Sequence, residues 1–193
     1  MPEEAGRRSI GAQLREWAVL ILIAFALVFF VQLVIATPYR IPSESMEPTL
    51  VDGDRVVVNR LSYSSGDVQR GEVVVFERPP VLEGTDDMIK RVIGLPGEAV
   101  RIDGGEVYVG GLIAAEPYLA EESATFTGRR IPGCDASTPD LVGVCIVPEG
   151  HVFVLGDNRG NSADSRFFGP IPVDDIIGRA AVRVWPLTSL NQL

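Results

Sequence analysis

Two serines in a short proline-bounded segment are the first residues whose types and spacing could support catalysis. The segment IPSESMEPTL, residues 41–50, places Ser43 and Ser45 between Pro42 and Pro48. Because proline restricts the backbone, such a loop can hold a serine hydroxyl in a fixed, exposed geometry. Serine is a poor nucleophile at neutral pH unless a neighbouring base takes its proton. The chain must therefore supply a base from elsewhere.

His151 is the only histidine, so any Ser-His-Asp triad would have to use it. It lies in PEGHVFVLG, which reads as a turn leading into a strand. A residue in such a turn is usually exposed to solvent. We therefore interpret His151 as an exposed turn residue rather than as the base.

Lys90 is the only lysine, and it lies in DDMIKRVIGLPGE with apolar residues on both sides. Arginine effectively does not deprotonate, whereas a buried lysine can become a neutral base. Lowering a lysine pKa from about 10.4 to about 8 corresponds to about 3 kcal/mol of lost stabilisation of the ammonium form. Burial away from water can cause a loss of this size. Side chains alternate along a strand, so Lys90 would point inward while Arg91 stays in solvent. Lys90 is therefore the predicted base.

No metal or cofactor is predicted. One histidine and no Cys-x-x-Cys pair leave few soft ligands for a metal. The stretch DNRGNSADS is superficially similar to a calcium loop, but Arg159, Ser162 and a missing glutamate break the EF-hand pattern. P-loop and dinucleotide glycine patterns are absent from the sequence.

Residues 18–36, AVLILIAFALVFFVQLVIA, form an apolar run of 19 residues with no charge. A helix of this length is about 28 Å long, close to the ~30 Å hydrocarbon core of a bilayer. Trp17 and Tyr39 flank the run as interfacial aromatic residues would. A helix packed on a soluble domain would have a polar face, which this run lacks. A cleaved signal peptide has a shorter apolar region of ~7–15 residues. We therefore predict a transmembrane signal anchor.

Arg7, Arg8 and Arg15 precede this run, and positive charge tends to stay on the cytoplasmic side. We therefore expect residues 1–17 in the cytoplasm, one membrane span, and the rest of the chain outside. The net charge of −9 resides entirely in residues 37–193. Such an acidic body argues against a nucleic-acid partner, because basic patches supply most of that affinity.

The rest of the chain predicts a mostly β fold, an antiparallel β-sheet catalytic domain with a small inserted β lobe. The insert spans 103–147, between catalytic segments 37–102 and 148–193. Cys134 and Cys145 lie in it, and in an outward compartment we expect a disulfide rather than free thiols. Short runs rich in Val and Ile alternate with Gly, Pro and Asp; the predicted strands are DRVVVNRL, GEVVVF, IKRVIGL, EAVRI, EVYVGG, HVFVLG and GRAAVRVW.

Three segments taken together resemble the bacterial type I signal peptidases, which are membrane serine proteases with a Ser/Lys dyad. They are PSESMEPTL at 42–50, IKRVIGLPGE at 89–98 and GDNRGNSADSR at 156–166. They stand in the order of the family's nucleophile, base and C-terminal segments, and they follow an anchor where the family has one. Gly160 departs from the family, because many relatives carry Asp or Asn there.

The resemblance implies roles for individual residues. Ser45 would be the nucleophile and Lys90 the general base, while Ser43 would help the Ser45 N–H form the oxyanion hole. Ser162 would orient the lysine. Asp164 and Arg166 would form a structural ion pair. A shallow apolar substrate pocket would be lined by Ile41, Pro42, Met46, Leu50 and Ile89.

The resemblance also implies removal of signal peptides from secreted preproteins after small residues, of the Ala-x-Ala type. The enzyme would need no cofactor, and it would lie in the bacterial cytoplasmic membrane with its catalytic domain outside. Two alternatives remain open at this point. One is a Ser/Lys maturation protease with narrow targets, and the other is a non-catalytic anchored β module that binds a partner.

Overall fold

The computed structural model describes residues 10–34, 36–63, 68–120, 123–135, 137, 141–186 and 191–192. Within these ranges the chain has one long helix, α1 (Ile10–Val34), and one short helix, α2 (Ser165–Phe168). Two 3-10 turns are η1 (Glu44–Met46) and η2 (Val173–Asp175). The other elements are strands, so the predicted mostly β fold is confirmed.

Each of the seven predicted apolar runs contains a strand, and all the pairings between strands are antiparallel. The strands from these runs are β2 (Arg55–Asn59), β3 (Val73–Phe76), β4 (Met88–Gly94), β5 (Ala99–Asp103), β6 (Glu106–Val109), β9 (His151–Leu155) and β11 (Ile176–Trp185). Short strands that the sequence did not indicate are β1 (Ala36–Arg40), β7 (Leu112–Ile113), β8 (Val144–Ile146), β10 (Ile171–Pro172) and β12 (Asn191–Gln192).

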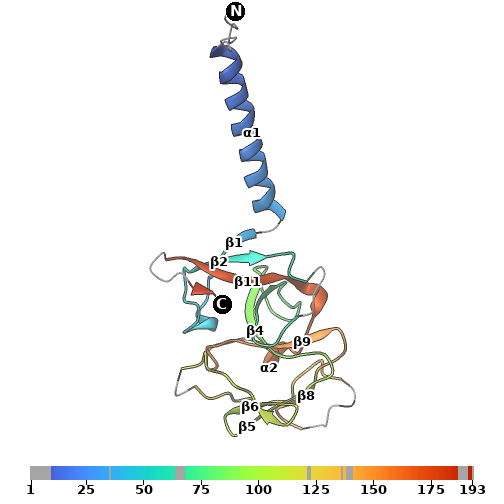
Figure 1. Ribbon diagram of the computed structural model, residues 1–193. Coiled ribbons are helices and arrows are strands. Elements are labelled where there is room, and N and C mark those ends of the chain that lie inside the picture. Colours follow the sequence, from blue (N-terminus) through green and yellow to red (C-terminus); the bar gives the residue numbers. More distant parts are fainter. Residues whose placement is uncertain are drawn as a thin grey trace, which may run out of the picture.

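The larger sheet has the strand order β1-β2-β11-β3-β4-β9-β10, with β12 paired to β11. β4 lies between β3 and β9, and its Lys90 stands opposite Val74 of β3. Figure 1 shows this curled sheet between α1 and the second sheet. Lys90 therefore lies on an interior strand.

Both faces of β3 and β4 are covered, so these strands form the middle of the core. On β3, Val73 and Val75 belong to one apolar cluster, whereas Val74 and Phe76 belong to another. All seven residues of β4 are buried. A strand buried on both faces reads as a continuous apolar run rather than an alternating one, as VVVF does here.

The predicted exposure of Arg91 is wrong, because the face of β4 opposite Lys90 is also covered. Arg91 is 6 % exposed and forms a bidentate ion pair with Asp157, at 2.6 and 2.9 Å. It also donates to the Gly71 carbonyl, and its guanidinium lies 4.0 Å from the centre of the Tyr118 ring. The loop after β9 supplies the carboxylate that makes this burial possible.

The second sheet has the order β7-β6-β5-β8 and lies at the far end of the molecule from α1 (Figure 1). It includes β5, so its first strand begins at Ala99, before residue 103. Its inner side packs on β4 and β9 through a cluster that contains Val100, Val107 and Phe153. A disulfide joins Cys134 to Cys145 of β8.

Helix α1 projects from the side of the body that carries β1 (Figure 1). It ends at Val34, two residues before the end of the predicted anchor segment 18–36. The strand β1 begins at Ala36, the last residue of that segment. The position before Pro38 disfavours helix, and the chain there pairs with β2 instead. None of the helices, taken over the described residues, combines the length and the apolar character of a membrane span. Arg7 and Arg8, on which the predicted orientation depends, lie outside the described residues.

We expect Asp157→Asn to lower the free energy of unfolding by about 3 kcal/mol, because it leaves the buried Arg91 charge without its counter-ion. Urea denaturation followed by tryptophan fluorescence measures this. Asp103→Asn is the matched control, because Asp103 pairs with Arg101 in an exposed ion pair and should contribute less than about 1 kcal/mol. Equal losses from the two variants would contradict the importance of the buried pair.

Candidate active site

Ser45 is held by a 3-10 turn whose next residues are anchored in the core. The turn is η1, and the Leu50 N–H donates to the Met46 carbonyl just beyond it, at 2.9 Å. Met46 and Leu50 are fully buried, whereas Ser45 keeps 8 % of its surface exposed. The apolar residues that follow the serine therefore fix its backbone and leave its hydroxyl at the edge of a cavity.

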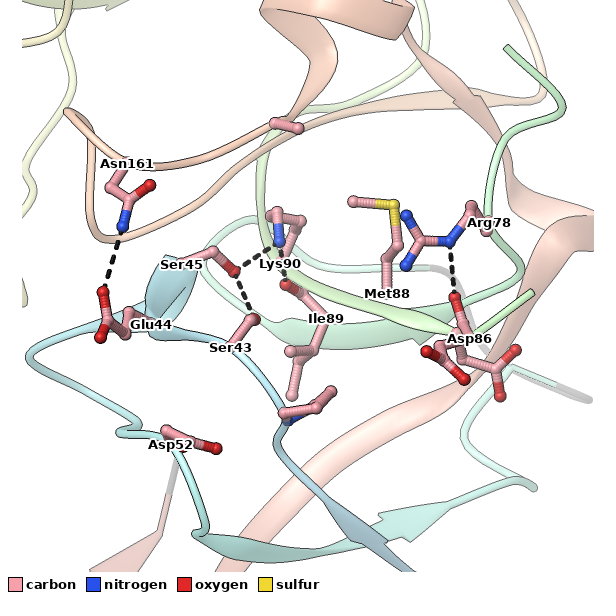
Figure 2. A pocket seen from close by; sticks show the side chains of 13 residues that line it. Ser43, Glu44, Ser45, Asp52, Arg78, Asp86, Met88, Ile89, Lys90 and Asn161 are labelled. Atoms are coloured by element: carbon pink, nitrogen blue, oxygen red, sulfur yellow. Dashed lines mark hydrogen bonds between the residues drawn. The ribbon is translucent and has the colours of Figure 1, made fainter. Parts of the chain in front are cut away.

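Lys90 and Ser45 meet across this edge, although 45 residues separate them in the chain. Lys90 Nζ lies 2.7 Å from Ser45 Oγ and donates to the Ile89 carbonyl at 2.8 Å. Ser43 Oγ lies 3.2 Å from Ser45 Oγ on the other side, as Figure 2 shows. The Lys90 residue is only 2 % exposed. The serine hydroxyl is therefore within direct proton-transfer distance of a buried amine.

Burial lowers the pKa of Lys90 from 10.5 to about 8. This value also includes the positive charge of Arg78, which lowers the pKa, and the carboxylates of Asp164 and Asp157, which raise it. Loss of water is the largest effect, because an ammonium ion in a poorly hydrated site is less stable than the neutral amine. A fraction of the amine is therefore neutral near neutral pH, which is what a general base requires.

The loop after β9 closes over the nucleophile segment through four hydrogen bonds. Asn158 N–H donates to the Ser45 carbonyl, and Asn158 Nδ2 donates to the Glu44 carbonyl, both at 3.1 Å. Thr49 Oγ1 donates to Asp157 Oδ2 at 2.6 Å, and Asn161 Nδ2 donates to Glu44 Oε2 at 3.2 Å. The position of Ser45 therefore depends on this loop as well as on η1. Neither the residue pattern nor the resemblance indicated a role for Thr49, Asp157 or Asn158.

Ser162 lies in the same loop, next to the backbone of Ser45. A Cβ atom built on Gly156 would come within 2.3 Å of Ser162 Oγ and 2.5 Å of the Ser45 carbonyl oxygen. Only glycine allows the chain segments to approach this closely. Ser162 Oγ is buried, and it has no hydrogen-bond partner among the described residues. The structure therefore places Ser162 beside the site but records no bond from it to Lys90.

Asp164 and Arg166 form the ion pair that the resemblance implied. Arg166 Nε donates to Asp164 Oδ1 and one terminal nitrogen donates to Oδ2, both at 2.8 Å. Asp164 is fully buried; it caps α2 and accepts from the Gly156 N–H at 3.1 Å. The pair thus ties the end of the loop to its beginning at Gly156.

The cavity in front of Ser45 and Lys90 has a volume of about 510 Å³. Of the five residues implied for an apolar pocket, only Pro42 and Ile89 line it. Ile41, Met46 and Leu50 lie in the core behind, because they anchor the serine segment to the sheet. The rest of the lining is largely polar, and its charged members besides Lys90 are Glu44, Asp52, Arg78, Asp86 and Asp87.

His151 lies away from this cavity and takes no part in its lining. Its Nδ1 lies 2.9 Å from the Glu149 carbonyl oxygen, within its own turn. Among the described residues, no group of three or more His, Cys, Asp or Glu side chains is arranged to hold a metal ion.

The comparisons with known proteins agree with this arrangement. The family model described as "Signal peptidase, peptidase S26" matches residues 14–185. Signal peptidase IB of Staphylococcus aureus strain N315 is 40% identical over 188 residues, which cover 93% of each chain. The chain belongs to the signal peptidase family. Its members are serine endopeptidases, so the resemblance read from the three segments is confirmed.

Two further signal peptidases are also similar to the chain. A probable signal peptidase I-2 of Synechocystis sp. strain PCC 6803 is 40% identical over 162 residues, covering 82% of this chain and 67% of the relative. A solved signal peptidase I from Enterococcus faecalis V583 is 33% identical and covers 59% of this chain and 97% of its own, with a TM-score of 0.44.

We expect Lys90→Met to stabilise the folded protein by about 3 kcal/mol at pH 7, because it removes an amine whose pKa falls from 10.5 to about 8 on folding. In the wild type the unfolded chain binds more protons between these values, so its stability rises with pH across that window. The gain of Lys90→Met should therefore be full below about pH 8 and vanish above about pH 10.5.

Urea denaturation of both proteins at several pH values measures this difference. A Lys90→Met variant that is no more stable than the wild type at pH 7 would show that burial does not lower the pKa of the amine.

Proposed function

We propose that this signal peptidase family member removes N-terminal signal peptides from translocated preproteins, with Ser45 as nucleophile and Lys90 as general base. The single observation that carries the assignment is the 2.7 Å approach of Lys90 Nζ to Ser45 Oγ. A binding module has no need of a buried lysine beside a serine. The family match and the order of the three segments support the same reaction.

In this mechanism neutral Lys90 accepts the proton of Ser45 Oγ, and Oγ attacks the scissile carbonyl carbon. The Ser45 N–H and the Ser43 hydroxyl stabilise the resulting oxyanion. The lysine ammonium then protonates the leaving amine, which leaves an acyl-enzyme at Ser45. Lys90, neutral again, activates a water molecule that releases the acyl group. No metal or cofactor is required at any step.

We assign Ser162 the task of orienting the lysine amine. Its buried hydroxyl has no partner among the described residues, and it lies beside the Ser45 carbonyl. A buried hydroxyl without a partner costs free energy, so a small change of the Lys90 side chain that brings Nζ to it would be favourable. The Asp164–Arg166 ion pair holds the loop in which Ser162 lies.

The cleaved peptides would carry small residues before the cut. Pro42, Met88, Ile89 and Ala163 are the apolar contributors to the wall of the cavity that holds the two reacting groups. Figure 2 shows Met88 and Ile89 on β4 beside Lys90, with Ser43 and Ser45 facing them. We assign small residues, Ala or Gly, to the positions before the cut, because the family match supports cleavage of the Ala-x-Ala type.

Helix α1 is assigned to the membrane, as a single-pass anchor with the body on the outer side. The support is the uncharged sequence 18–36, together with apolar side chains that the protein itself leaves uncovered, such as Leu22 and Phe25, each 70 % exposed. Ser45 follows soon after, so its site would lie near the outer surface of a bacterial cytoplasmic membrane. The lipid bilayer and secreted preproteins are thus the expected partners, without nucleic acid.

The proposed division into a catalytic domain and an insert corresponds to the two sheets except at β5, which belongs to the second sheet but lies mostly before residue 103. The larger sheet carries η1, β4 and the loop after β9, whereas the segment 103–147 contributes most of the second sheet. We assign the reacting groups to the first unit, which takes in 37–102 and 148–193.

The decisive test is cleavage of an Ala-x-Ala preprotein in detergent. Ser45→Ala and Lys90→Arg should both be inactive, the second because a guanidinium keeps the charge but cannot accept the serine proton. His151→Ala is the matched control and should retain most activity. The wild-type rate should rise with pH through about 8, as Lys90 loses its proton. Ser162→Ala should lower kcat more than it changes KM.

An active Lys90→Arg variant, or loss of activity in folded His151→Ala, would overturn the Ser/Lys assignment. A wild-type enzyme that cleaves one preprotein but ignores a panel of others would favour the narrow-target alternative.

A separate experiment tests the anchor. Protease added outside intact spheroplasts should degrade the body of the protein, because the bases Arg7, Arg8 and Arg15 precede the apolar run. Immunoblotting for the C-terminal part follows the digestion. A body that is protected in spheroplasts but digested after lysis would show the opposite orientation.

A further inference from the structure

Glu116, from the segment between β7 and β8, reaches the loop that closes over Ser45. Its two carboxylate oxygens accept hydrogen bonds from the two terminal nitrogens of Arg159, at 2.5 and 3.1 Å. The Arg159 side chain is 1 % exposed and that of Glu116 is 11 % exposed. The pair therefore lies almost completely out of solvent, where an ion pair is held to a narrow geometry.

Arg159 uses its remaining donors to fix the loop itself. Its Nε donates to the Gly156 carbonyl at 2.9 Å, and Nη1 also donates to Thr125 Oγ1 at 2.5 Å. Thr125 is buried and lies in the same inserted segment as Glu116. One guanidinium thus joins two side chains of the insert to the residue at which the loop begins.

The loop depends on such contacts, because residues 156–163 contain no helix or strand. Asn158, next to Arg159, donates to the carbonyls of Glu44 and Ser45. Ser162 lies three residues after Arg159. A displacement of Arg159 would therefore move both the serine backbone and the hydroxyl beside it.

A second link runs from Glu116 to the strand that carries Lys90. The Tyr118 hydroxyl donates to Glu116 Oε1 at 2.8 Å, and the Tyr118 ring lies under the Arg91 guanidinium. Arg91 follows Lys90 directly and holds Asp157 of the loop. Glu116 thus contacts both supports of the site, one through Arg159 and the other through Tyr118.

We propose that Glu116 is a positioning residue of the reaction. Through it the inserted segment holds the side chains of Ser45 and Lys90 in their position relative to each other. It touches neither substrate nor reacting atoms and acts through Arg159 and Tyr118. The inference rests on the proposed function, since it names a further determinant of the same site. It also gives the insert a part in catalysis that residue types alone do not indicate.

The test compares kcat and KM of the full-length protein on an Ala-x-Ala preprotein. Glu116→Gln keeps the shape of the side chain and removes its charge, so we expect kcat to fall about tenfold with KM within about twofold, because the loss is one of alignment. Glu116→Asp keeps the charge with a shorter reach and should fall between Glu116→Gln and the wild type. Because Glu116 acts through Arg159 as well as Tyr118, the loss of kcat in Glu116→Gln combined with Arg159→Gln should be smaller than the product of the two single fold-losses.

Val107→Ala is the control for a purely structural role. Val107 is buried in β6 of the second sheet, within the same inserted segment as Glu116. The variant should lower the urea midpoint of unfolding without changing the loop contacts of Glu116, and its kcat should stay at the wild-type value. A Glu116→Gln enzyme with wild-type kcat would overturn the inference. So would fold-losses that multiply in the double variant, or an equal loss of kcat in Val107→Ala.

Should Glu116→Gln fail to fold, the Glu116→Asp variant decides, since a wild-type kcat there with a lowered midpoint marks a structural role. The wild-type rate beside Ser45→Ala keeps the two proposals apart. An active wild type with an inactive Ser45→Ala leaves the proposed function standing whatever Glu116 does, whereas an inactive wild type defeats the proposed function itself.

Discussion

The rest of the site depends on keeping one lysine amine out of water. Lys90 is on an interior strand whose two faces are covered, and burial lowers its pKa to about 8. The same burial brings Nζ to 2.7 Å from Ser45 Oγ. An exposed lysine would stay protonated near neutral pH and would be no base, so the stability lost by burying it is linked to the activity we propose.

Placing Ser45 requires two segments that are far apart in the chain. The apolar residues after Ser45 anchor η1 in the core. The loop after β9 forms hydrogen bonds to the same segment through Asp157 and Asn158. That loop carries buried charges whose partners come from β4 and from the insert. A buried ion pair fixes geometry more than it adds stability, and fixed geometry is what a proton transfer between two side chains requires.

Residue types narrowed the candidate base to Lys90, because the chain offers one lysine and one histidine and only the lysine lies in an apolar strand. The resemblance then assigned the Ser45–Lys90 pair its proposed roles. The Val-rich runs likewise predicted the strands that hold it, since such runs suit buried strands. The surroundings could not be predicted in the same way. Arg91 was expected in solvent because its counter-ion, Asp157, lies 66 residues away. Ile41, Met46 and Leu50 were expected in a pocket because an apolar residue beside a nucleophile reads alike whether it faces substrate or core.

The charged lining of the cavity and the contact of Glu116 with Arg159 were also missed. Both depend on side chains from separate loops that only the folded chain brings together. One signal was present in the sequence: a segment with two arginines, Arg159 and Arg166, that follows a buried strand needs carboxylate partners. Nothing in the local pattern says which of the many acidic residues provide them.

The lowered pKa of the buried Lys90 amine can be measured directly, because the composition isolates this side chain. Because Lys90 is the only lysine, protein labelled with [¹³C]lysine gives a single side-chain NMR signal in detergent micelles. Titration of its ¹³Cε shift should show a midpoint near 8 in the folded protein. A midpoint at the ordinary lysine value of about 10.4 would contradict the account, because the amine would then be hydrated and charged at the pH where the base must act.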